Sequence, residues 1–219
     1  MGMCILLNKP NFKLCKKLAI ELLARQNIWS STIDVQSLKY DKKIIFDSIQ
    51  GYAEATNTPI KNFIDHKTQL LSDGCCIPMY DRGIFVVLYN FDLNTSLERL
   101  NWTLAHEVGH IYLGHKKDSD IEEIEAHYFA AQLLIPEYIL FMIDQKWGLD
   151  EKDICKLFNV SQEAARKRVA AYKNKMYINK GAFDEDIWKM MCKHIEDYYF
   201  IRNASDGLKR FMNTSIVNI

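Results

Sequence analysis

The chain has 219 residues, of which 48% are hydrophobic and 12% are aromatic, and this composition excludes an intrinsically disordered protein. Its 28 Lys and Arg residues equal its 28 Asp and Glu residues, so the overall charge gives no argument for a nucleic acid or an anionic membrane as partner. The six cysteines are scattered without a C-x-x-C pair, and no segment approaches the ~20 apolar residues of a membrane span. We therefore expect a globular, cytoplasmic protein with reduced thiols and no membrane partner.

Helices are predicted near the N-terminus. Apolar positions at helical spacing predict an amphipathic helix over residues 12–26, and a shorter helix is predicted over residues 31–39. The run KKIIFDSI, residues 42–49, is typical of a strand.

A β-hairpin is predicted next. The apolar runs 75–80 and 83–90 are separated by Asp81 and Arg82, and Gly83 stands at the corner. Together with the strand over 42–49, these runs predict a small antiparallel sheet with helices against it.

The segment after the hairpin is predicted to form a long helix. Residues Thr95-Ser-Leu-Glu98 fit a capping box, and Gly114 is a natural C-terminal stop. Between them the apolar residues recur every three or four positions, as Leu97, Leu100, Leu104, Val108 and Ile111.

The sequence His106-Glu107-Val108-Gly109-His110 lies inside this helix. Residues four apart lie one turn above each other, so both imidazoles can reach one ion, and at about 100° per residue they point away from the apolar stripe. This is the H-E-x-x-H pattern, in which two histidines bind a catalytic zinc ion and the glutamate acts as general base in peptide hydrolysis. The alternative is two solvent-exposed histidines on a structural helix.

A third metal ligand is expected from the next helix, which is predicted to begin after residues 118–120 and to end at Leu134 before Pro136. We rank Glu123 first, because Ala126 and Ala130 share its face and would let two helices approach closely.

Other residues of this helix leave alternatives open. Glu125 ranks second as a ligand, and either acid could instead be a solvated first-turn residue that the helix dipole favours. His127 could orient Glu123 or compete with it as a ligand. His115, just past the preceding helix, is interpreted as a surface histidine.

Three runs carry a resemblance to a known family. They are TLAHEVGHIYLGH (103–115), ExEAHYFAAQLLIP (123–136) and FNVSQEAARKRV (158–169), and they resemble the ImmA/IrrE metallopeptidases over roughly residues 12 to 170. The resemblance implies a thermolysin-like zinc site of His106, His110 and Glu123 with Glu107 catalytic, and a substrate that is a DNA-binding repressor. The chain departs from the family at His127, where Asn or Asp is usual.

The expected fold is α+β, with a zincin-like lobe of a small antiparallel sheet, the H-E-x-x-H helix and the glutamate helix, followed by an all-helical region. The expected domains are a metallopeptidase domain over 1–147, a helix-turn-helix-like region over 148–175, and a helical extension of unknown role over 176–219.

The helix-turn-helix outline consists of residues 149–158, a break at Asn159-Val160, and a helix that Ser161 caps. Its second helix is basic, with Arg166, Lys167, Arg168, Lys173 and Lys175. It could contact DNA phosphates, but we favour a helical pair packed on the catalytic lobe, because one basic helix is a modest footprint and the family uses this pattern structurally.

The strand before the catalytic helix gives a docking hypothesis. A substrate peptide would add as a strand along residues 83–89, with contacts from Gly83, Phe85, Val86, Val87 and Leu88. The alternative is an ordinary core strand.

Two functions follow from the sequence. The first is a zinc endopeptidase with one catalytic Zn²⁺ that cleaves a repressor or antitoxin. The second is a non-catalytic regulator that binds metal or DNA through the same scaffold. The sequence gives no indication of the oligomeric state.

Overall fold

The computed structural model describes residues 9–65, 68–92, 95–116 and 119–216, with side chains up to residue 205. It divides into two compact units: the first contains Met1–Gln26 and Asp34–Pro136, and the second contains Asn27–Ile33 and Glu137–Ile219. The expected mixture of a small sheet with a largely helical remainder is confirmed. The expected boundaries at 147 and 175 fall inside the second unit, and a division of the helical region into separate domains stays a prediction.

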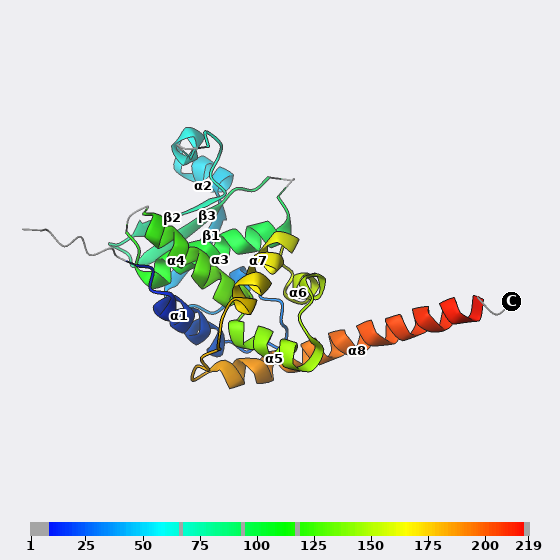
Figure 1. Cartoon of the computed structure of the whole chain (residues 1–219). Coiled ribbons are helices and arrows are strands. Elements are labelled where there is room, and N and C mark those ends of the chain that lie inside the picture. The colour runs from blue at the N-terminus through cyan, green and yellow to red at the C-terminus, as the bar shows by residue number, and fades with distance from the viewer. Residues whose placement is uncertain (1–8, 66–67, 93–94, 117–118, 217–219) are drawn as a thin grey trace, which may run out of the picture. The chain divides into compact units, whose positions relative to one another are not determined.

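The first unit contains a three-stranded sheet, in the order β1-β3-β2 (Figure 1). The strands are β1, Lys43–Ser48; β2, Gly74–Met79; and β3, Ile84–Tyr89. The predicted hairpin of β2 and β3 is confirmed, and Gly83 adopts the left-handed φ of 62° that the turn requires.

The expectation of a purely antiparallel sheet is wrong, because β1 pairs parallel to β3. The connection from β1 to β2 contains a helix that the sequence analysis did not predict, α2 (Ile49–Thr56), and the 3₁₀ turn Ile60–Phe63. A connection of this length carries the chain across the sheet, whereas an antiparallel neighbour needs only a tight turn. The hairpin then returns β3 to the centre, between β1 and β2.

The two faces of the sheet pack against different helices. On one face Val86 and Leu88 of β3 form a small core with Ile49 at the start of α2. The other face contacts α3, Leu97–Leu113. This layering places α3 directly beside β2 and β3.

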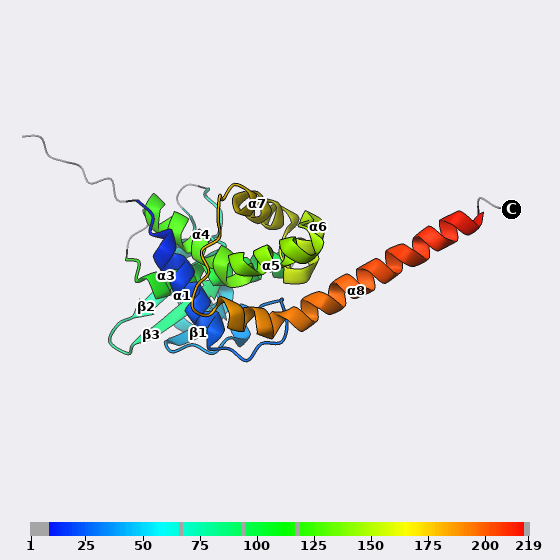
Figure 2. The same cartoon turned by 60° about the horizontal axis from the view of Figure 1, so that its bottom comes forward.

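Two further helices pack with α3 in the first unit. Helix α1, Phe12–Ala24, contacts α3 and α4, and α4, Asp120–Leu134, contacts α3 along its length (Figure 2). Cys15, Ala19 and Leu23 of α1 are buried there. The three helices therefore pack against one another beside the sheet.

The ends of α3 differ slightly from the prediction. Its N-cap is Ser96, whose hydroxyl accepts a hydrogen bond from the Arg99 N–H, so the cap begins one residue later than a box starting at Thr95. Leu97 is exposed and does not belong to the buried stripe. The stop at Gly114 is confirmed by its left-handed φ of 71°.

The helix predicted over residues 31–39 is wrong, because only a 3₁₀ turn at Val35–Ser37 forms there. Leu38 is extended, and the buried Ser31 hydroxyl donates a hydrogen bond to the Leu157 carbonyl. Polar groups of this segment thus pair with distant partners, which a local pattern does not reveal.

The second unit is helical. Its helices are α5, Glu137–Trp147; α6, Glu151–Phe158; α7, Gln162–Lys173; and α8, Asp184–Ile216. Helix α5 was not predicted, because Pro136 reads as a stop although it also fits the entry to a new helix. The outline of α6, a left-handed Asn159 and a Ser161 cap is confirmed.

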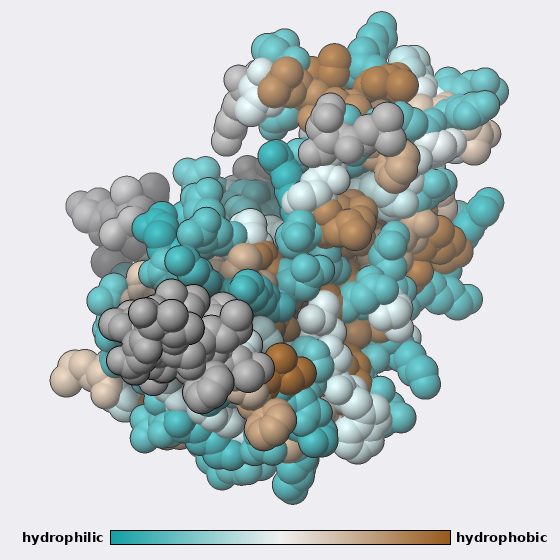
Figure 3. Space-filling view, turned by 90° about the vertical axis from the view of Figure 1, so that its right-hand side faces the viewer, coloured by the Kyte–Doolittle hydropathy of each residue, from teal (hydrophilic) through white to brown (hydrophobic). Residues whose placement is uncertain are grey.

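Of the helices that the structure describes, none alone is long and apolar enough to cross a membrane, although α4 and α5 taken together meet that test as a bent pair. Figure 3 shows apolar residues gathered at the upper end of that view, where the segment from α2 to β2 lies. The exposed large apolar residues of this segment are Ile60, Ile64 and Leu70.

Candidate metal centre

Two imidazoles of α3 meet at one point. His106 and His110 lie one helical turn apart, and their Nε2 atoms are 3.0 Å from each other. Both side chains are largely buried, with exposed fractions of 12% and 16%. The i,i+4 spacing on a capped helix is what brings the two rings together.

A carboxylate from α4 completes this group. The Oε2 atom of Glu123 lies 3.3 Å from His106 Nε2, and its Oε1 atom lies 3.3 Å from His110 Nε2. Among the described residues, these three form the group of side chains whose ligand atoms lie close enough together to hold one metal ion. The ranking of Glu123 over Glu125 therefore agrees with the geometry.

Small residues let α4 approach α3 closely enough for this contact. Ala126 and Ala130 are fully buried, as the sequence analysis expected. A Cβ atom built on Gly109 would lie 3.2 Å from the carbonyl oxygen of Ala126 and 3.1 Å from the Phe129 ring. Gly109, the x residue before the second histidine, thus allows this helix spacing without a shift of Ala126 or Phe129.

The separations match those around a tetrahedral metal ion. Bonds of about 2.0–2.1 Å to nitrogen and oxygen place two ligands of a tetrahedron about 3.3 Å apart. The observed separations of 3.0 Å, 3.3 Å and 3.3 Å fit that value. Two imidazoles and one carboxylate also leave a fourth position open, as catalytic zinc sites do.

The protonation states favour a cation at this point. Burial, and next the neighbouring His106, lower the pKa of His110 to about 4. A hydrogen bond from His106, opposed by burial, lowers the pKa of Glu123 to about 2. At neutral pH the ring nitrogen of His110 and the carboxylate of Glu123 are therefore available as ligands.

Glu107 lies on the side of α3 that faces β2. Its exposed fraction is 9%, and its negative charge reaches the thiols of Cys75 and Cys76. A Cβ atom on Gly74 would lie 3.5 Å from Glu107 Cγ and 2.5 Å from Thr103 Cγ2. The absence of a side chain at Gly74 lets β2 lie this close to the glutamate.

The other candidates of this region have different neighbours. His127 is exposed, and its ring centroid lies 4.4 Å from that of His106. Glu125 does not reach the His106–His110 pair but bonds to His115, Nε2 to Oε2 at 3.0 Å. The interpretation of His115 as a surface histidine is wrong, because its side chain is 7% exposed.

The docking hypothesis for β3 is also wrong. Both edges of β3 are occupied, by β1 on one side and by β2 on the other, so no peptide can add as a strand along Gly83 to Leu88. Val86, Val87 and Leu88 are core residues. Among the residues that the structure describes, no strand pairs with the outer side of β2, so the open edge beside α3 belongs to β2.

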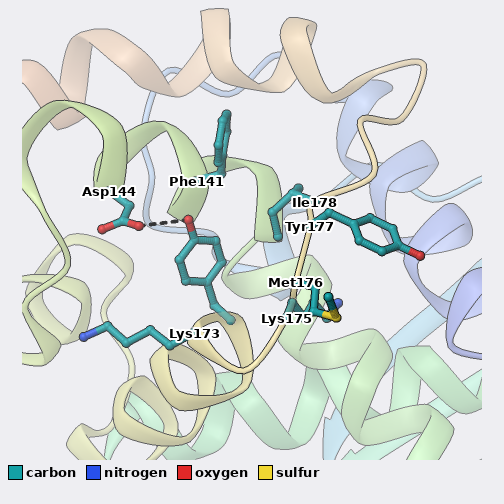
Figure 4. A pocket seen from close by; sticks show the side chains of 8 residues that line it. Phe141, Asp144, Lys173, Lys175, Met176, Tyr177 and Ile178 are labelled. Carbon is teal, nitrogen blue, oxygen red and sulfur yellow. Dashed lines mark hydrogen bonds between the residues drawn. The ribbon is translucent and has the colours of Figure 1, made fainter.

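The second unit contains a separate hollow of about 300 Å³ (Figure 4). Tyr172 donates a hydrogen bond to Asp144 across it, and Phe141, Lys173 and Tyr177 contribute to its wall. The one carboxylate among its lining residues, that of Asp144, accepts this hydrogen bond from Tyr172. The lining residues therefore offer no group of metal ligands.

Residues 83–170 match the model of the IrrE N-terminal-like domain, Peptidase_M78. The match covers β3 and the helices that carry His106, His110 and Glu123, and it extends over α5 and α6 into α7. No curated protein matches the chain.

Proposed function

We propose that the chain is a zinc-dependent endopeptidase of the ImmA/IrrE family that cleaves one specific protein, because residues 83–170 match the model of the IrrE N-terminal-like domain. The proposed substrate is a DNA-binding transcriptional repressor, which is what the family resemblance implies, or alternatively an antitoxin.

One observation carries the proposal: the ligand atoms of His106, His110 and Glu123 converge at mutual separations of 3.0–3.3 Å. Two nitrogen donors and one oxygen donor, with room for a fourth position, suit Zn²⁺ better than Ca²⁺ or Mg²⁺, which prefer oxygen ligands. The geometry thus supports zinc, and it supports a catalytic site.

The metal, when bound, would polarise the scissile carbonyl and lower the pKa of a water molecule to about 7. A residue of the chain transfers the protons. The carboxylate of Glu107 accepts a proton from the attacking water and passes it to the leaving nitrogen. The partial burial of Glu107 holds this carboxylate on the side of α3 that faces β2 and keeps bulk water from competing for the proton.

The edge of β2 is where we expect the main chain of the substrate to pair. The Asn90 N–H donates to the Asp73 carbonyl, and directly opposed pairs alternate in an antiparallel ladder, so Gly74, Cys76 and Pro78 direct their main-chain groups to the open edge. Pro78 has no N–H, which leaves the N–H groups of Gly74 and Cys76, at the end nearest Glu107.

The alternative of a non-catalytic DNA-binding regulator has less support. Arg168 of the basic helix is buried, Lys175 forms an ion pair with the buried Glu137, and Lys167 pairs with Glu163. These contacts favour the interpretation of α6 and α7 as a packed helical pair.

The test is the Glu107→Gln variant, co-expressed with candidate DNA-binding repressors whose fragments are then sought. We expect the variant to keep its bound zinc and to lose cleavage by about 10²–10⁴-fold, because the amide cannot accept the proton of the water. Glu98→Gln, on the same helix but in its first turn, about two turns before Glu107, is the matched control and should cleave normally. Full cleavage by Glu107→Gln would refute the catalytic role.

A further inference from the structure

His115 and Glu125 extend the metal site by a chain of hydrogen bonds. The Nδ1 atom of His115 lies 2.9 Å from Nδ1 of His110, and its Nε2 atom lies 3.0 Å from Oε2 of Glu125. The second oxygen of Glu125, Oε1, accepts a hydrogen bond from the main-chain N–H of Asn11 at 2.5 Å. The side chains of His115 and Glu125 are 7% and 14% exposed, so water competes little for these bonds.

The positions of the protons along these hydrogen bonds follow from the last group in the series, the carboxylate of Glu125. A carboxylate only accepts hydrogen bonds, so the Nε2 atom of His115 must carry a proton. A neutral imidazole has one N–H, so the Nδ1 atom of His115 is then an acceptor. The Nδ1 atom of His110 must therefore donate to it, which leaves Nε2 of His110 without a proton.

The Nε2 atom of His110 is the one that lies 3.0 Å from His106 Nε2 and 3.3 Å from Glu123 Oε1. With the opposite tautomer, this nitrogen would carry a proton and could not bind a metal ion. The direction of every hydrogen bond in the chain thus agrees with metal binding by His110.

We propose that His115 and Glu125 are positioning residues that fix His110 in its metal-binding tautomer and ring orientation. The inference rests on the metal site of the proposed function and adds two residues to it. Asn11 is the N-cap of α1, so the chain of bonds also ties the start of α1 to the metal ligand. Hydrogen-bond partners of this kind typically contribute about 10–100-fold to metal affinity.

The Glu125→Gln variant is informative because an amide has one accepting oxygen. If that oxygen turns to the Asn11 N–H, the NH₂ group faces Nε2 of His115 and reverses the whole chain. We expect zinc affinity, measured by competition with a chelator, to fall about 10–100-fold. The matched control is Asp120→Asn, which removes one negative charge from the exposed first turn of the same helix and should bind zinc as the wild type does.

The wild-type protein supplies a second readout that needs no variant. Nitrogen-15 NMR of its histidines, on the metal-free protein at neutral pH, reports which ring nitrogen carries the proton. We expect the proton of His110 on Nδ1 and the proton of His115 on Nε2. Protons on the opposite nitrogens would overturn the proposal, even if Glu125→Gln fails to fold.

Failure of the inference differs from failure of the proposed function. If Glu125→Gln folds and binds zinc as tightly as Asp120→Asn, while the wild type binds zinc and cleaves its substrate, the positioning role is wrong and the peptidase stands. If the wild type binds no zinc, the proposed function is wrong and the positioning role, which rests on it, falls with it.

Discussion

The carboxylate of Glu107 lies beside two thiols, and this neighbourhood gives a chemical readout of its position. Burial, and next the charge of Glu107, raise the pKa of Cys75 and of Cys76 to about 12. In metal-free Glu107→Gln, the loss of the charge should lower both pKa values. Each unit by which the pKa falls increases the thiolate fraction about tenfold at pH 8.5. Alkylation by iodoacetamide at this pH should therefore be faster at both cysteines.

Cys15 is an internal control for this experiment. Burial and the charge of Glu125, not of Glu107, raise its pKa to about 11, so its alkylation rate should not change. Mass spectrometry of the labelled peptides separates the sites. An unchanged rate at Cys75 and Cys76 would mean that the carboxylate of Glu107 lies elsewhere.

The candidate metal ligands could be predicted because their signal is local. His106 and His110 are four residues apart on one helix, and Glu123 shares a face with Ala126, where a close helix contact was expected. His115 was misjudged because its burial depends on the turn at Gly114 and on the approach of α4. Its partner Glu125 was ranked as an alternative ligand, since no local pattern shows which acid meets which histidine.

Among the elements, the contact between α3 and α4 is the one that assembles the site, and Gly109 sets its distance. In Gly109→Ala, helix propensity should stabilise α3 by about 0.8–1 kcal/mol. The added methyl group would meet main-chain atoms of Ala126 at 3.2–3.3 Å, which cannot rotate away, and such overpacking costs about 1–3 kcal/mol. We expect the overpacking to dominate.

The Gly109→Ala variant should therefore have a lower Tm without metal, and it should bind zinc about 5–30-fold more weakly, because closing the helices around the ion costs roughly 1–2 kcal/mol more. Gly181→Ala is the control, since its Cβ atom would make ordinary contacts of 3.4–3.6 Å with Asp184. Zinc affinity equal to that of the control would show that the spacing of α3 and α4 does not depend on Gly109.

The hairpin, α1, α3, α4 and the pair α6–α7 could be predicted from periodicity, caps and turn residues. The strand order could not, because the parallel pairing of β1 with β3 depends on where the chain crosses the sheet between residues 49 and 73. Because of this long-range pairing, β3 is the central strand. The strand expected to pair with a substrate is therefore β2 and not β3.

In the whole molecule, the candidate metal ligands all belong to the first unit. Zinc should therefore stabilise this unit selectively, by about 2.7 kcal/mol at a free concentration of 100 times Kd. Hydrogen exchange of the full chain should become slower in α3 and α4 on addition of zinc and should stay unchanged in α6 and α7. Equal slowing in α6 and α7 would contradict a site confined to the first unit.

The order of the predicted strands and helices correctly indicated an α+β protein, and the described cysteines Cys15, Cys75, Cys76, Cys155 and Cys192 are free, as expected. It did not indicate that residues 27–33 belong with the helices after Pro136. That assignment depends on the buried contact of Ser31 with Leu157, which joins residues 126 positions apart.

Anomalous diffraction from zinc-loaded crystals at the zinc absorption edge would show whether His106, His110 and Glu123 hold one metal ion. We expect a single strong peak, about 2.0–2.2 Å from the Nε2 atoms of both histidines and from one carboxylate oxygen of Glu123. No peak, or a peak between His115 and Glu125 instead, would contradict it.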